Sequence, residues 1–144
     1  VAQETGVRIA LENLPGTRLP CRPLESTQEL RAFIADFPSE NVGICLDVGH
    51  CLISGYDPTD QARIASERLY ALHLQDGDGR DDRHWMPGRG MIDWPSLGAV
   101  LSDVDFDGAW TIEVTIVHTD DAAARIAEEC AALRERWEGS GIPA

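Results

Sequence analysis

Four residues that can bind a metal ion occur at similar places in four apolar runs of the chain. They are Glu12 in IALEN, Asp47 in ICLDV, His73 in ALHLQ and Glu113 in TIEV. Three carboxylates and one imidazole form an oxygen-rich ligand set, which suits Mn²⁺ or Mg²⁺ better than a closed thiolate zinc site, with Co²⁺, Fe²⁺ or Zn²⁺ as further candidates. A shared cation would also remove the desolvation cost of burying such groups. The sequence therefore predicts one divalent-metal site.

The apolar runs that carry these residues are predicted to be β-strands, each followed by a helix. The expected strands are residues 7–13, 42–48, 69–75 and 109–115. The expected helices are residues 26–37, 57–65, 93–101 and about 120–137. Strict alternation of strand and helix, with near-continuous apolar strands, indicates a parallel sheet covered by helices. The predicted class is α/β, and because no linker divides the chain, residues 1–144 are predicted to form one domain.

Capping residues mark the starts of the expected helices. Ser26 and Glu29 have the spacing of a capping box, in which each side chain accepts a hydrogen bond from the other residue's backbone N–H. Asp93 precedes a proline that fits the first helical turn. The helix after the capping box has apolar residues at helical spacing, namely Leu30, Phe33, Ile34 and Phe37.

The motifs favour a barrel over a doubly wound sheet. No GxGxxG follows the first expected strand, and no GxxxxGK[ST] occurs. Active sites of barrels lie at the carboxyl ends of the strands, which is where the four candidate ligands lie. The residues two positions before each ligand, which share its side of the strand, are all small: Ala10, Cys45, Ala71 and Thr111. The alternating residues are bulky and are predicted to face the helices: Ile9, Leu11, Ile44, Leu46, Tyr70, Leu72, Trp110 and Ile112.

Charge and hydropathy argue against nucleic acid and membranes as partners, and the cysteine spacing bears on the location of the protein. A net charge of −13 repels phosphate backbones and anionic membranes, so nucleic acid is not an expected partner. No apolar run approaches the roughly 20 residues that cross a bilayer, so no membrane association is expected. The cysteines form no CxxC pair and are predicted to be free thiols of a cytoplasmic protein: Cys21, Cys45, Cys51 and Cys130.

The sequence resembles the xylose-isomerase-like sugar phosphate isomerase/epimerase family, which includes ketose 3-epimerases, hydroxypyruvate isomerase and inosose dehydratases. The resemblance runs through IALENLP, GICLDVGH, ALHLQDGDGRDDRHWMPGRGMIDW and AWTIEV. It implies a complete (β/α)₈ TIM barrel of about twice this length, of which this chain would be the C-terminal half. The missing N-terminal half-barrel, or a homo-oligomer partner, is expected to complete the barrel.

The resemblance also implies an activity and residue roles. Glu12, Asp47, His73 and Glu113 would bind the metal, and the two glutamates would also form the catalytic acid/base pair. His50, in the DxxH element, would contact the substrate. Proton removal beside a ketone would give a metal-stabilised enediolate, and its reprotonation would epimerise or isomerise a small sugar, sugar phosphate or related hydroxy-ketone. A dehydratase outcome stays open.

The glycine-rich loop after the third expected strand offers three more candidate substrate contacts. Arg80 and Arg89 have side chains that hold a phosphate or carboxylate well. His84 is a candidate for a substrate contact or a lid residue. The alternative for all three is an ordinary solvated loop residue.

Two other functions compete with the isomerase hypothesis. The segments CLDVGHCLISGYD and Asp82-Arg83-His84 also resemble endonuclease IV, in which a DxH pair after the seventh strand binds additional zinc. A DNA-repair nuclease needs a basic groove, and the charge of −13 argues against one. The second alternative is a catalytically inactive interaction module, because a half-barrel would expose strand edges at residues 7–13 and 109–115.

Overall fold

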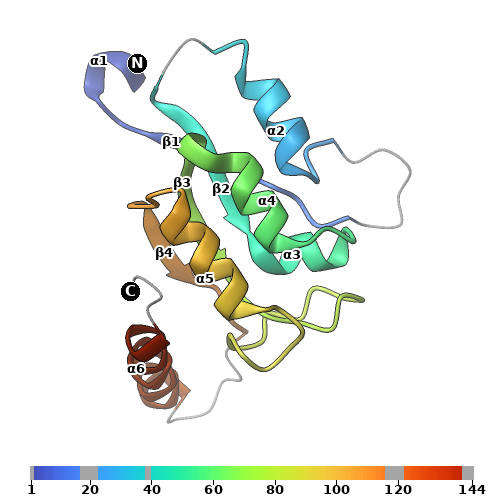
Figure 1. The fold of residues 1–144 in the computed structure, drawn as a ribbon, viewed down its shortest axis with the longest axis vertical. Helices are drawn as coiled ribbons and strands as arrows, with labels where there is room; N and C mark the ends of the chain where they lie inside the picture. The colour runs from blue at the N-terminus through green and yellow to red at the C-terminus, as the bar shows by residue number, and fades with distance from the viewer. Residues whose placement is uncertain (1, 17–22, 38–39, 116–121, 141–144) are drawn as a thin grey trace.

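The computed structural model describes residues 2–16, 23–37, 40–115 and 122–140 and contains one four-stranded parallel sheet. Its strands are β1 (Ile9–Glu12), β2 (Val42–Asp47), β3 (Leu69–Leu74) and β4 (Ala109–Ile112). They lie in the order β1-β2-β3-β4, so each strand pairs with its neighbour in the sequence (Figure 1). The predicted α/β class and all four predicted strands are confirmed, and the arrangement is that of a partial TIM barrel.

Helices lie before, between and after the strands, and those that follow β1, β2 and β3 pack on one face of the sheet. The helices are α1 (Ala2–Thr5), α2 (Thr27–Ile34), α3 (Val48–Ile53), α4 (Pro58–Ala65), α5 (Trp94–Asp103) and α6 (Ala122–Ser140), with a 3-10 turn at Ser66–Arg68. Helix α4 packs between α2 and α5 on this face (Figure 1). Helix α6 lies beside β4, where the Trp137 ring packs at a tilt against the rings of Trp110 of β4 and Trp94 of α5. Residues 120–121 of the predicted last helix lie outside the described residues.

Helix α2 begins as the capping box predicts. The Ser26 hydroxyl accepts a hydrogen bond from Glu29 N at 3.3 Å, and the Glu29 carboxylate accepts one from Ser26 N at 3.2 Å. The helix ends at Ile34, three residues before the predicted end. Phe33 and Phe37 are 47% and 44% exposed, so they are not part of the core as the spacing suggested.

Helix α3 was not predicted, because its residues continue the apolar run of β2. The backbone leaves the strand at Asp47, whose carboxylate accepts a hydrogen bond from His50 N at 2.7 Å and caps the new helix. The predicted strand of residues 42–48 therefore ends one residue earlier. The cap and the candidate metal ligand are the same side chain.

The two faces of the sheet differ as the alternation predicts. Ile44, Leu46 and Leu72 are fully buried beneath the helices, in one core with Leu30, Leu97 and Leu101. On the opposite face, Ala10 and Thr111 are exposed. Ile9 was expected to face the helices, but it is 45% exposed because β1 lies at the edge of the sheet. The face that carries the small residues is thus open at the edge strands β1 and β4, whereas Cys45 of β2 is only 4% exposed.

Three of the four cysteines are described, and all three are free: Cys45, Cys51 and Cys130. Burial, with a smaller contribution from the Glu12 carboxylate, raises the pKa of Cys45 to about 12, so this thiol stays protonated beneath the candidate ligands. Cys21 lies outside the described residues. Within the described part of the chain, no helix combines the length and the apolar character that a membrane crossing requires.

Candidate metal centre

The four predicted ligands converge at the carboxyl end of the sheet. Glu12, Asp47, His73 and Glu113 each offer one ligand atom, and these atoms lie within 4.8 Å of one another. The parallel register produces this convergence, because it pairs Asp47 with His73, and Glu113 N extends β4 by donating to the Leu74 carbonyl at 3.0 Å. We call these four residues the carboxylate cluster. Their role as metal ligands stays a prediction, but the geometry it needs is present.

The chemistry of His73 fits a bound cation. Its buried Nδ1 lies 2.7 Å from Glu113 Oε2 and 3.4 Å from Glu12 Oε1. These short distances do not amount to hydrogen bonds, because the direction is poor, and Nδ1 has no hydrogen-bond partner among the described residues. A buried ring nitrogen that faces two carboxylates without a directed bond is suited to share a metal ion with them.

Asp47 is the most deeply buried member of the carboxylate cluster. Its side chain is fully buried, and burial raises its pKa above the usual value. Its carboxylate accepts hydrogen bonds from His50 N and from the Gln75 amide. Asn13 fixes the backbone of Asp47, since its side chain accepts from Asp47 N at 2.7 Å and donates to Asp47 O at 3.0 Å. A buried charge held this firmly favours a cation opposite it.

His50 lies beside the carboxylate cluster, in the first turn of α3. Its Nδ1 is 2.8 Å from the Asn13 carbonyl, 3.4 Å from Glu12 Oε1 and 3.8 Å from Asp47 Oδ2. Its Nε2 faces Asp82 Oδ2 at 3.6 Å. The predicted substrate contact is therefore adjacent to the centre, at the edge nearest Glu12.

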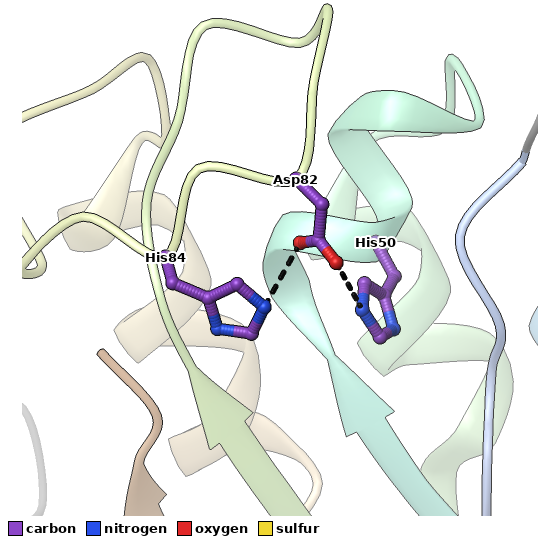
Figure 2. A group of neighbouring side chains, drawn as sticks. All are labelled: His50, Asp82 and His84. Carbon is purple, nitrogen blue, oxygen red and sulfur yellow. Dashed lines mark ion pairs between the residues drawn. The ribbon is translucent and has the colours of Figure 1, made fainter. Parts of the chain in front are cut away.

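A second group of potential ligands adjoins the first. Asp82 lies between the rings of His50 and His84, with its two oxygens 3.6 Å and 3.2 Å from their Nε2 atoms (Figure 2). One ligand atom of each residue lies within 4.8 Å of the others, and we call this group the histidine cluster. Burial alone would lower the pKa of His84, but the Glu113 carbonyl and the Asp82 carboxylate raise it. Asp82 was predicted only as part of the endonuclease IV-like DxH pair with His84, and not as a residue of the isomerase site.

The loop that carries Asp82 and His84 is tied to a buried carboxylate at its base. Asp76, fully buried, accepts hydrogen bonds from the backbone of Gly77 and Gly88, from Ile92 N and from the Trp94 indole. Two backbone hydrogen bonds between Asp76 and Trp85, at 2.8 and 3.0 Å, close the loop. His84 lies beside Glu113, because its Nδ1 is 3.1 Å from the Glu113 carbonyl, and its role as a substrate contact or lid residue stays a prediction. Sequence reasoning missed Asp76.

The two predicted arginine contacts lie away from the carboxylate cluster. Arg80 is exposed, and its backbone N–H donates to Asp78. Arg89 pairs with Glu129 of α6 at 2.8 Å. Among the described residues, neither side chain makes a hydrogen bond or ion pair with the carboxylate cluster. The structure thus brings together five of the predicted residues and His84, but not Arg80 or Arg89.

Comparison with known proteins places this geometry in a family. The D-psicose 3-epimerase of Enterocloster bolteae is 32% identical over 112 residues, which cover 78% of this chain and 35% of that protein. The probable endonuclease 4 of Thermoplasma volcanium is 31% identical over 121 residues, 75% of this chain and 41% of that protein. The chain therefore spans well under half the length of these curated relatives.

Solved structures and a family profile agree with this placement. A D-tagatose 3-epimerase-like protein superposes with a TM-score of 0.73 at 26% identity, over 94% of this chain and 51% of that one. The profile of the family described as "Xylose isomerase-like TIM barrel" matches residues 1–136, nearly the whole chain. The chain belongs to the xylose isomerase-like TIM barrel family.

Proposed function

We propose that this chain is the metal-binding part of an isomerase or epimerase that acts on a small sugar, a sugar phosphate or a related hydroxy-ketone. The observation that carries the proposal is the convergence of Glu12, Asp47, His73 and Glu113 at the carboxyl end of the sheet. The names of its relatives, which include sugar 3-epimerases, support the same reaction class. Mn²⁺ or Mg²⁺ suits this oxygen-rich set best.

The members of the carboxylate cluster differ in how far their side chains are exposed to solvent. The side chains of Glu12 and Glu113 are 32% and 40% exposed, whereas that of Asp47 is fully buried. In this proposal the two glutamates reach a substrate from the open side, and the buried Asp47 holds the metal. A bound divalent ion would supply Lewis-acid stabilisation of the enediolate oxygens.

Proton transfer by the glutamates accounts for the chemistry. One glutamate takes the proton from the carbon beside the carbonyl; the electron pair of that C–H bond forms a C=C bond to the carbonyl carbon, and the π pair of the carbonyl moves to its oxygen. If the other glutamate returns a proton to the opposite face of the same carbon, the product is the epimer. If the proton returns to the adjacent carbon, the product is the aldose–ketose isomer. His50, beside Glu12, contacts the substrate in this scheme.

The open face of the sheet suggests what completes the site. Ala10 and Thr111 are exposed on the side where a barrel has its interior. We expect an N-terminal half-barrel, or a second copy of the chain, to cover this face and to supply the rest of the pocket. A cytoplasmic location is also expected, because the described cysteines are free thiols.

Solvent exchange at carbon tests the proposal. The protein with Mn²⁺ would be incubated with ketoses and ketose phosphates in D₂O, and deuterium at the carbon beside the carbonyl would be followed by NMR. Glu113→Gln should abolish exchange, whereas Glu135→Gln, on the exposed side of α6, should leave it intact. Exchange that survives Glu113→Gln would show that this acid/base assignment is wrong. Metal binding without any exchange would favour the inactive interaction module.

The histidine cluster supports a second candidate, hydrolysis of a phosphodiester in DNA. His50, Asp82 and His84 adjoin the carboxylate cluster, so the site has ligands for more than one ion, and two-metal sites are common in nucleases. Some relatives are named probable endonuclease 4. The charge of −13 opposes this candidate. Cleavage of an abasic duplex, with more than one metal ion bound per chain, would favour it over the isomerase.

A further inference from the structure

Gln75 lies between the carboxylate cluster and the loop that follows β3. The residue comes directly after β3 and is 1% exposed. Its Nε2 is 3.2 and 3.1 Å from the two oxygens of Asp47, and 3.2 Å from Asp82 Oδ1. Its Oε1 accepts a hydrogen bond from His84 N at 3.1 Å. One buried amide therefore contacts a candidate metal ligand and two residues of the histidine cluster.

The partners of Gln75 permit only one orientation of its amide. Carboxylates only accept hydrogen bonds when ionised, and a backbone N–H only donates. The nitrogen must therefore face Asp47 and Asp82, and the oxygen must face His84. A glutamate at this position would offer only acceptors, and a leucine would offer neither. The position thus requires both functions of an amide.

Gly49 leaves the space that Gln75 occupies. A Cβ at Gly49 would lie 2.4 Å from the Gln75 Cδ, which is too close for any side chain to fit without displacement. Gly49 lies in the first turn of α3, between the Asp47 cap and His50. The start of α3 therefore packs directly against the amide, and this contact keeps Gln75 close to Asp47.

The loop that Gln75 contacts on the side away from Asp47 also has a fixed position. Asp76 ties the base of the loop through four N–H donors, so the backbone that carries Asp82 and His84 has a defined position. The Thr115 N–H donates to the His84 carbonyl at 3.0 Å and joins the loop to the segment after β4. Gln75 connects this fixed loop to Asp47.

We propose that Gln75 is a positioning residue, which holds the Asp47 carboxylate in its ligand orientation and couples it to the loop that carries Asp82 and His84. The inference rests on the proposed metal centre. Without the Gln75 amide, the Asp47 carboxylate loses one of its two described hydrogen-bond donors, and the backbone N–H of His84 loses its acceptor. Groups that orient a metal ligand from behind commonly change metal affinity by about 10- to 100-fold.

The test compares two buried glutamines that are replaced in the same way. Gln75→Leu removes the coupling amide. Gln61→Leu is the matched control, because Gln61 is 3% exposed and its Oε1 accepts from Thr27 N at 2.7 Å in the helical layer. Each variant buries a leucine and leaves one backbone N–H without its partner. Mn²⁺ affinity would be measured by titration calorimetry, and the visible spectrum of bound Co²⁺ would report the ligand geometry.

We expect Gln75→Leu to weaken Mn²⁺ binding by at least about 10-fold and to change the Co²⁺ spectrum, while Gln61→Leu changes neither. Gly49→Ala should reproduce the effect of Gln75→Leu, because it displaces the same amide. Equal Mn²⁺ affinity in the parent protein and Gln75→Leu would overturn the assignment while leaving the metal centre standing.

A second measurement separates this inference from the proposed function. Hydrogen exchange at the His84 amide should be faster in Gln75→Leu than in the parent, and unchanged in Gln61→Leu. A parent protein that binds no Mn²⁺ would overturn the proposed function, and the exchange rate of His84 would still decide the coupling. An unchanged exchange rate in Gln75→Leu would overturn the coupling.

Discussion

Replacement of Asp47 by asparagine should make the metal-free protein more stable and at the same time abolish its response to metal. Burial raises the pKa of Asp47 in the folded state, so the ionised carboxylate disfavours folding at every pH above that raised value. Asparagine has nearly the same shape and no charge. It can still accept the hydrogen bond from His50 N that caps α3.

Burial is the largest cause of the raised pKa, and repulsion between the carboxylates adds to it by an amount that depends on their separation. The ligand atoms of the carboxylate cluster all lie within 4.8 Å of one another, and at that separation two carboxylates repel by about 3.5 kcal/mol at an effective dielectric constant of 20 and by about 0.9 kcal/mol in bulk water. Hydrogen bonds from His50 N and Gln75 offset part of this repulsion. We expect Asp47→Asn to raise the free energy of unfolding of the metal-free protein by about 1–3 kcal/mol at pH 7. The gain should shrink as the pH falls and Asp47 becomes protonated.

Urea unfolding with and without Mn²⁺ measures both halves of this prediction. Mn²⁺ at about 100 times its dissociation constant should stabilise the parent protein by about 2.7 kcal/mol, and it should not stabilise Asp47→Asn. Asp57→Asn is the matched control, because the Asp57 carboxylate also caps a helix, α4, but is exposed and is not a member of the carboxylate cluster. A metal-free Asp47→Asn protein that is less stable than the parent, or that keeps the full Mn²⁺ effect, would refute the reasoning.

Three further predictions concern the scaffold. Ser26→Ala should lower the free energy of unfolding by about 1 kcal/mol, measured in urea, because it removes one half of the α2 capping box; no change would mean that the box does not stabilise α2. Asp76→Asn should accelerate hydrogen exchange at the Gly88 amide, because an asparagine cannot accept all four N–H donors; exchange as slow as in the parent would contradict the role of Asp76 as the base of the loop. Leu72→Ala should cost about 2–5 kcal/mol in thermal or urea unfolding, whereas Met91→Ala, at a side chain 70% exposed, should cost little; equal effects would place the core elsewhere.

The strands and the carboxylate cluster could be predicted because both depend on local pattern. Each strand is a short apolar run, and the parallel alternation with helices sends the carboxyl ends of all strands to one edge. Residues in phase near the strand ends, such as Glu12 and His73, must then meet. This is why the convergence was predictable from one sequence, and why the bulky alternating residues Ile44 and Leu72 were correctly assigned to the core.

Other features depend on contacts that no periodic pattern encodes. Helix α3 was missed because Val48 continues the apolar run, and only the hydrogen bond from His50 N to Asp47 ends the strand. The roles of Gln75 and Asp76 were missed because their partners lie in other elements or in the irregular loop after β3, such as Asp47 of β2 and Trp94 of α5. The loop arginines were predicted as substrate contacts from charge and position alone; Arg89 pairs with Glu129 of α6, and its substrate role stays a prediction.

The central claim is that four side chains from four strands hold one divalent ion. Anomalous diffraction from crystals of the protein grown with Mn²⁺ tests it most directly. We predict an anomalous peak for one Mn²⁺ ion within bonding distance of oxygens of Glu12, Asp47 and Glu113 and of the nearby ring nitrogen of His73. A strong peak among His50, Asp82 and His84 with none in the carboxylate cluster, or no peak at either place, would contradict it.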